Sequence, residues 1–195
     1  MAEVVLIHHA RGLTEGLLAF ADDLRAEGHI VHTPDLFGQV PGSIEEGLAL
    51  ARSIGGEAID RQADEYVAAL PDALVYAGFS FGVSVAQRLA QTRPGARGAL
   101  LFDACMPISG EWAIGPWPDG VAVQIHGMDK DEFFALEGDI DAAREIVEAM
   151  GPDLAELFVY PGDQHLFADS SLPSYDKDAA GLAVERSKAF LARLS

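Results

Sequence analysis

Short, mostly apolar runs alternate along this chain with longer amphipathic stretches, and this alternation restricts the fold more than any other feature. Apolar strands are expected where both faces of a sheet are buried, as in a parallel sheet covered by helices. Pro34 ends one such run, and Pro71 stands shortly before another. The predicted strands are Val4–Ile7, Ile30–Thr33, Ala73–Ala77, Ala99–Phe102, Val121–Ile125 and Leu157–Tyr160.

The stretches between these runs have the spacing of helices. Apolar residues recur three and four positions apart in Leu17–Glu27, and Gly28 ends that helix. Asp139 is the expected N-cap of Ile140–Met150. The other predicted helices are Ile44–Ala51, Gly56–Leu70, Gly82–Arg93 and Ala179–Leu194, whereas Ala104–Gly120 has no clear period. Strand–helix alternation predicts an α/β fold with a mostly parallel sheet of about six or seven strands, flanked by helices on both faces.

Length and composition favour one domain over residues 1–195. Of the 195 residues, 49% are hydrophobic, which is enough to bury a sizeable core. No stretch has the unbroken apolar length of a membrane helix, and we interpret the opening MAEVVLIHHA as a first strand, not a secretory signal. Cys105 is the one cysteine, so no internal disulfide can form. These features predict a cytoplasmic protein.

The charge of the chain excludes some partners. With 31 acidic against 13 basic residues, the formal net charge is −18. Such a surface repels phosphate backbones and anionic lipid, so neither a nucleic acid nor a membrane is expected as a partner. The acidic residues are spread along the chain, which is typical of a solvated surface, and the oligomeric state is left open.

The sequence Gly78-Phe79-Ser80-Phe81-Gly82 carries the strongest chemical signal. It follows a predicted strand and precedes a predicted helix, the context in which GxSxG forms a sharp turn that exposes the serine hydroxyl. The alternative is a glycine-rich turn with an idle serine. The strand–turn–helix context favours Ser80 as a nucleophile.

A serine nucleophile needs a base and an acid to orient that base. His165 follows the last predicted strand, so it should emerge at the same sheet edge as Ser80. Asp129 follows Val121–Ile125 and is the predicted acid, with Asp131 and Asp103 as its rivals. Any of these carboxylates could instead be a helix cap or a solvated group.

Two backbone N–H groups should stabilise the oxyanion. One belongs to Phe81, the residue after the nucleophile, and the other to Ala10 in the loop after the first strand. His8 and His9 are adjacent on an extended chain and point to opposite sides, so they form a poor chelating pair. No motif indicates a metal or another cofactor.

The irregular segment Ala104–Gly120 contains two tryptophans. Trp112 and Trp117, together with Ile114, could line an apolar substrate pocket or could simply cover the sheet edge. The sequence does not separate these two interpretations.

With these elements in place, the chain resembles the dienelactone hydrolase family. The similarity lies in Val4–Gly12, Pro34-Asp35-Leu36-Phe37-Gly38, Gly78–Gly82 and Tyr160-Pro161-Gly162 leading to His165-Leu166-Phe167. The resemblance implies a single-domain α/β-hydrolase fold, a nucleophile–Asp–His triad and no metal. It also supports Asp129 over Asp103, because the family's acid follows the penultimate strand.

The chain departs from the family pattern at three positions. Ser80 stands where the namesake enzymes carry cysteine, and His9 stands where they carry a glutamate beside it. Asp169 stands where they carry an arginine that holds the substrate carboxylate. A carboxylate repels an anionic substrate, so a preference for neutral esters is expected, which Arg11 would offset if it pointed into the pocket.

The sequence thus predicts a serine hydrolase acting on a small-molecule ester or lactone, with Ser80, Asp129 and His165 as its triad. His9, Arg11, Trp112 and Trp117 are the tentative pocket residues. A thioesterase or lysophospholipase could use the same site. The alternative from another class is a non-catalytic ligand-binding module with the same fold.

Overall fold

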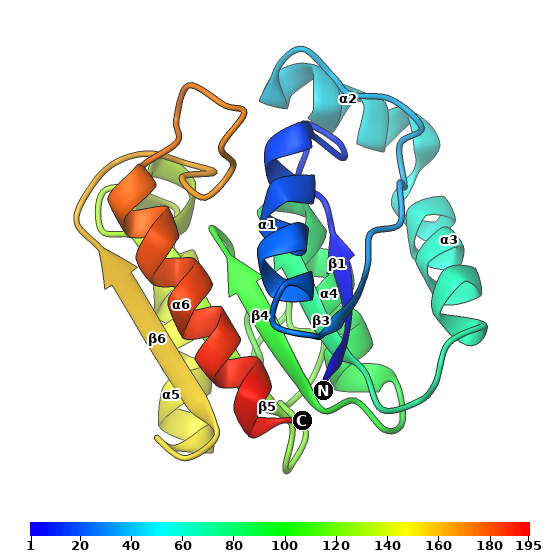
Figure 1. Cartoon of the computed structure of the whole chain (residues 1–195), viewed down its shortest axis with the longest axis vertical. Coiled ribbons are helices and arrows are strands. Elements are labelled where there is room, and N and C mark those ends of the chain that lie inside the picture. Colours follow the sequence, from blue (N-terminus) through cyan, green and yellow to red (C-terminus); the bar gives the residue numbers. More distant parts are fainter.

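Six parallel strands form one sheet in the computed structural model, which describes all 195 residues (Figure 1). The strand order is β2-β1-β3-β4-β5-β6, and every neighbouring pair is parallel. The strands are β1 (Glu3–Ile7), β2 (Ile30–His32), β3 (Val75–Phe79), β4 (Gly98–Phe102), β5 (Ala122–Met128) and β6 (Ala155–Tyr160). The predicted α/β fold class is therefore confirmed.

Helices connect the strands where the amphipathic stretches predict them. They are α1 (Glu15–Arg25), α2 (Ile44–Ile54), α3 (Gly56–Ala68), α4 (Phe81–Thr92), α5 (Asp139–Met150) and α6 (Lys177–Arg193). A short π-helix, η1 (Glu132–Leu136), was not predicted. Asp139 is the first residue of α5 and not its N-cap, because Gly138 occupies the cap position and the Asp139 carboxylate accepts from the N–H of Cys105.

Two apolar clusters cover the two faces of the sheet. Alternate residues of each strand point to opposite faces. Thus Val5 packs among residues of α3, α4 and α5, whereas Val4 packs among residues of α1 and α6. Figure 1 shows α1 and α6 on one side of the sheet and α4 on the other. Burial on both faces explains why these strands lack a polar side, which is the pattern that predicted a parallel sheet.

The turn from β3 into α4 depends on two glycines. A Cβ on Gly82 would lie 2.5 Å from the carbonyl oxygens of both Ile7 and His8. A Cβ on Gly78 would lie 2.6 Å from the carbonyl oxygen of Gly82. The start of α4 can therefore sit directly on the end of β1, which holds Ser80 at φ 47° and ψ −114°.

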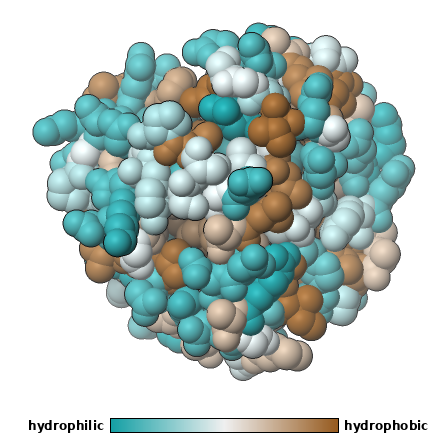
Figure 2. Space-filling view, turned by 45° about the horizontal axis from the view of Figure 1, so that its top comes forward, coloured by the Kyte–Doolittle hydropathy of each residue, from teal (hydrophilic) through white to brown (hydrophobic).

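The carboxyl ends of all six strands meet at one edge, which lies at the top of Figure 1 and is turned toward the viewer in Figure 2. Figure 2 shows a mostly hydrophilic surface there, crossed by a band of apolar groups. No helix combines the length and the apolar character needed to cross a membrane. Functional side chains are sought at this edge, where parallel α/β sheets collect them.

We expect Gly82→Ala to destabilise the fold, because the added methyl group would meet backbone atoms that cannot rotate away. Overpacking of this kind costs about 1–3 kcal/mol. Gly181→Ala is the matched control: Gly181 is exposed in α6 with open space around it, and alanine is the better helix former by about 1 kcal/mol. The free energy of unfolding from urea titrations measures both, and equal stability of the two variants would contradict the packing argument.

Candidate active site

Backbone strain is concentrated at the carboxyl edge of the sheet. The non-glycine residues with positive φ are Ser80 (47°), Asp103 (61°) and Leu166 (63°). Ser80 directly follows β3, Asp103 directly follows β4, and Leu166 lies in the loop after β6, next to His165. Strained residues of this kind persist where the surrounding structure enforces them, and they cluster at functional sites.

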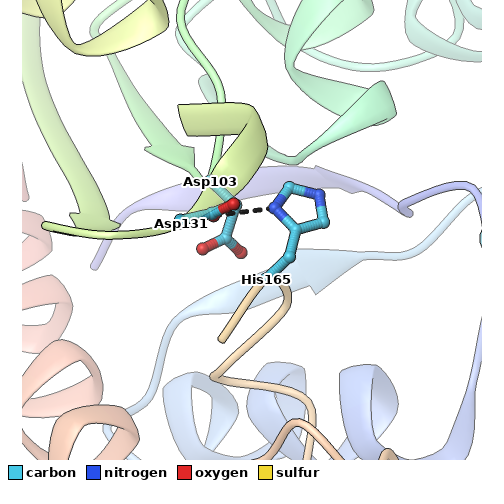
Figure 3. Close-up of side chains that lie close together, drawn as sticks. All are labelled: Asp103, Asp131 and His165. Atoms are coloured by element: carbon cyan, nitrogen blue, oxygen red, sulfur yellow. Dashed lines mark hydrogen bonds and ion pairs between the residues drawn. The ribbon is translucent and has the colours of Figure 1, made fainter. Parts of the chain in front are cut away.

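A continuous hydrogen-bonded chain joins a serine, a histidine and an aspartate. Ser80 Oγ lies 2.7 Å from His165 Nε2. On the other side of the ring, His165 Nδ1 lies 2.8 Å from Asp131 Oδ2 (Figure 3). The Asp131 side chain is fully buried, and its Oδ1 accepts from the N–H of Phe133 at 2.9 Å. Both ring nitrogens of His165 thus have protein partners.

The prediction that Asp129 is the acid is wrong. Asp129 is exposed, and its Oδ1 accepts from the N–H of Gly162 at 2.9 Å. The strand β5 runs three residues beyond the predicted end at Ile125, and the N–H of Asp129 still bonds to Tyr160 O. The chain turns only after this point, and Asp131 is the carboxylate that reaches His165.

Three carboxylates determine the basicity of His165. Burial by itself would lower the pKa of this imidazole, but the hydrogen bond to Asp131 and the charges of Asp103, Asp131 and Asp139 outweigh it. The pKa of His165 is therefore raised above 6.5. His165 is a stronger base than a free imidazole, as removal of a hydroxyl proton requires.

Asp103, the other rival, is fully buried but does not bond to His165. One oxygen of Asp103, one of Asp131 and a ring nitrogen of His165 all lie within 4.8 Å of one another. Burial raises the pKa of Asp103 to about 7. Its carboxylate is therefore part of the site and titrates close to neutrality.

The backbone N–H groups at the two predicted oxyanion positions have no acceptor within the protein. Phe81 is the first residue of α4, so its N–H has no acceptor within the helix. The N–H of Ala10, in the loop after β1, makes no hydrogen bond within the protein. Gly47 of α2 packs on this loop so closely that a Cβ would lie 1.7 Å from Ala10 O. The structure thus holds the loop of Ala10 in place with a free donor.

Two shallow hollows flank Ser80 and His165. The first, of about 250 Å³, has Ser80, Phe81, Asp103, Met106 and Phe133 among its lining residues. The second, of about 340 Å³, has Arg11, Ile44, His165 and Leu172 among its lining residues. Arg11 therefore lines the same hollow as His165. Phe133, which lies 4.5 Å from the His165 ring between centroids, was missed because no element was predicted over η1.

The other tentative pocket residues do not line either hollow. Trp117 is 5% exposed, packs in the core and donates from Nε1 to Val121 O, whereas Trp112 is 78% exposed. His9 is fully buried. Trp112, Trp117 and His9 were therefore wrong as pocket residues. Trp117 is instead a core residue.

His9 is instead the partner of Asp169 in a buried network. His9 Nε2 lies 2.8 Å from Asp169 Oδ2, and the Thr14 hydroxyl donates to the same oxygen. Asp169 Oδ1 accepts from the N–H of Ser171 at 2.9 Å and from its hydroxyl at 2.6 Å. The expectation that Asp169 could face the substrate is wrong, because this carboxylate is buried and fully bonded. It holds the chain at His9, one residue before Ala10.

We expect Asp169→Ala to lower the free energy of unfolding by about 3–5 kcal/mol, because it leaves His9, Thr14 and Ser171 without their buried acceptor. Urea titration measures the change, with the exposed Asp163→Ala as control. Although burial acts to raise it, the pKa of Asp169 falls from 3.8 to about 2 through its bonds to His9, Ser171 and Thr14.

Ionised Asp169 therefore contributes about 2 kcal/mol above pH 4, and this contribution is lost as the pH falls toward 2. The acid unfolding curve of wild type should show this loss, and that of Asp169→Ala should lack it. Equal acid sensitivity of the two proteins would contradict the assignment.

Solved structures with the same fold include several hydrolases. A proposed dienelactone hydrolase from Klebsiella pneumoniae subsp. pneumoniae MGH 78578 has a TM-score of 0.75 at 19% identity, over 98% of this chain and 87% of that one. A dienelactone hydrolase-like promiscuous phosphotriesterase from metagenomic libraries has a TM-score of 0.72 at 17% identity, over 100% and 87%. A proposed hydrolase of the α/β superfamily from Xanthomonas campestris pv. campestris has a TM-score of 0.67 at 16% identity, over 99% of both chains.

These identities are low, so the likenesses establish the fold and leave the substrate open. None of the curated proteins compared with the chain matches it. The dienelactone hydrolase family, however, matches from the first residue to the last, over residues 1–195. The protein therefore belongs to the dienelactone hydrolase family.

Proposed function

We propose that the protein hydrolyses a carboxylic ester or lactone through an acyl-serine intermediate. One observation carries this proposal: the chain of hydrogen bonds from Ser80 through His165 to Asp131, built on a strained turn at the start of a helix. This is the arrangement that activates a serine hydroxyl and stabilises the imidazolium that results. Membership of the dienelactone hydrolase family supports a hydrolase.

In the first half of the reaction, Ser80 Oγ attacks the carbonyl carbon of the ester while His165 Nε2 takes the hydroxyl proton. The carbonyl oxygen becomes an oxyanion, which the N–H groups of Phe81 and Ala10 stabilise. When the C–O bond to the alcohol breaks, His165 returns its proton to the leaving oxygen. The alcohol departs and the acyl group remains on Ser80.

In the second half, a water molecule takes the place of the alcohol. His165 accepts a proton from this water, whose oxygen attacks the acyl carbon, and the same donors stabilise the second oxyanion. Collapse breaks the bond to Ser80 Oγ, which recovers its proton from His165. Throughout both halves, Asp131 fixes the tautomer of His165 and balances the imidazolium charge.

The two hollows beside Ser80 and His165 suit the acyl and alcohol parts of a small ester. Phe133 and Met106 give the first hollow an apolar wall, and Ile44 and Leu172 do so in the second. Arg11 is the one basic side chain besides His165 that lines either hollow. The net charge of −18 disfavours anionic substrates at long range, so we propose small neutral esters as the substrate class.

A fluorophosphonate probe should label Ser80, because only an activated serine reacts with it. Labelling followed by digestion and mass spectrometry identifies the residue. Ser80→Ala should lose the label and reduce the turnover of p-nitrophenyl esters by about 10³-fold or more. Ser53→Ala, at an exposed position on α2, is the control and should behave as wild type. An unlabelled wild type that still binds esters would instead indicate a non-catalytic binding module.

Asp131→Asn should reduce kcat by about 10³–10⁴-fold, because an amide cannot hold the required tautomer of His165 or balance its charge. Asp129→Asn should keep wild-type rates, because that side chain bonds only to a backbone N–H at the surface. Ester kinetics of the two variants measure the difference. A larger loss in Asp129→Asn would restore the acid that the sequence predicts and overturn the role of Asp131.

A further inference from the structure

The buried carboxylate of Asp103 makes no hydrogen bond, unlike the other buried polar side chains of this protein. Its Oδ1 and Oδ2 are the buried side-chain polar atoms that have no hydrogen-bond partner. The N–H of Leu166 faces the carboxylate without reaching hydrogen-bond geometry. Desolvating a carboxylate without compensating bonds is costly, and the positive φ of 61° adds backbone strain.

Asp169 shows that a carboxylate can be buried in this protein with both of its oxygens hydrogen-bonded. Both carboxylates are fully buried and belong to the same sheet edge. Asp169 has its two oxygens bonded to His9, Thr14 and Ser171, as expected of a carboxylate that stabilises the fold. Asp103 has no such donors, so its burial should lower the free energy of unfolding. Its place in the core therefore calls for another explanation.

Asp103 lies next to the base of the triad. One of its oxygens is within 4.8 Å of a ring nitrogen of His165 and of an oxygen of Asp131 (Figure 3). It also lines the hollow that contains Ser80. The titratable groups that face this cluster are Asp131 after β5, His165 after β6, Asp139 at the start of α5, Tyr160 at the end of β6 and His126 in β5.

We propose that Asp103 is a positioning residue that acts through His165, as a second carboxylate whose charge favours the imidazolium formed when His165 takes the Ser80 proton. This inference rests on the proposed function. Asp131 bonds to Nδ1 and sets the tautomer, whereas Asp103 contributes its charge alone. The missing hydrogen bonds are then functional, because donors around Asp103 would disperse the charge that His165 senses.

The charge of Asp103 depends on pH in the range where the enzyme works. Burial raises the pKa of Asp103 to about 7, while the neighbouring His165 acts in the opposite direction. Above this pH the carboxylate is ionised and favours the protonated form of His165. Removing the charge should therefore lower the pKa of His165 and move the acidic limb of the kcat/KM profile to lower pH.

The test compares wild type with Asp103→Asn, Asp131→Asn and the double variant, and uses Asp129→Asn as the surface control. Asp103→Asn should lower the plateau of kcat/KM by about 10-fold and move the acidic limb down by at least about half a pH unit. The double variant should fall about 10-fold further than Asp131→Asn, because the remaining carboxylate partly supports His165. Asp129→Asn should match wild type.

Two readouts do not depend on turnover. The pKa of His165, followed by NMR on isotope-labelled histidine, should fall in Asp103→Asn. The melting temperature at pH 8 should rise by a few degrees in the same variant, because a buried, unpartnered charge has been removed. A structural role would give the opposite result, a lower melting temperature with unchanged titration of His165.

The outcomes separate this inference from the proposed function. An unchanged pKa of His165 in Asp103→Asn, or a double variant as active as Asp131→Asn, would overturn the role of Asp103 even if esters are hydrolysed. If no serine is labelled and no ester is cleaved by wild type, the proposed function fails, and with it the catalytic use of Asp103. A fall in the pKa together with a loss of rate supports both.

Discussion

The site depends on the contact between the start of α4 and the end of β1. At this contact Gly82 lies against the carbonyl oxygens of Ile7 and His8, with no room for a side chain. Because the helix begins so close to the sheet, Ser80 must turn sharply between β3 and α4. The same contact brings the loop after β1, which contains Ala10, to the side of the serine. One packing constraint thus positions both the Ser80 turn and the loop of Ala10, the candidate nucleophile and a proposed oxyanion donor.

The carboxylates of the site divide into three kinds of environment. Asp169 is buried and fully bonded, and it anchors the loop that contains Ala10. Asp131 is buried and shares its bonds between His165 and the backbone. The carboxylate of Asp103 is buried and makes no hydrogen bond. The carboxylate that lacks hydrogen bonds, Asp103, lies beside His165, as expected where function is built at the expense of the fold.

The structure explains two of the positions at which this chain departs from the family pattern. His9 and Asp169 stand where the namesake enzymes carry glutamate and arginine, and here the two form a buried pair with each other. The carboxylate of Asp169, which would have repelled an anionic substrate, therefore bonds to His9 inside the protein. Arg11 is left as the basic residue beside the hollow of His165. A fold does not by itself determine a substrate, so local residues of this kind decide it.

Local sequence was enough to determine the fold class and two members of the candidate triad. Strand burial on both faces leaves an apolar run, helix amphipathicity leaves a period, and the glycines of the Ser80 turn leave a motif, so each can be recognised without the structure. The acid could not be recognised in this way. Asp129 and Asp131 differ by two positions in one turn, and only the length of β5 and its pairing with β6 decide which carboxylate reaches His165. The burial of Trp117, the pairing of His9 with Asp169 and the isolation of Asp103 likewise involve residues far apart in sequence. Tertiary packing alone decided them, because no local pattern encodes a long-range contact.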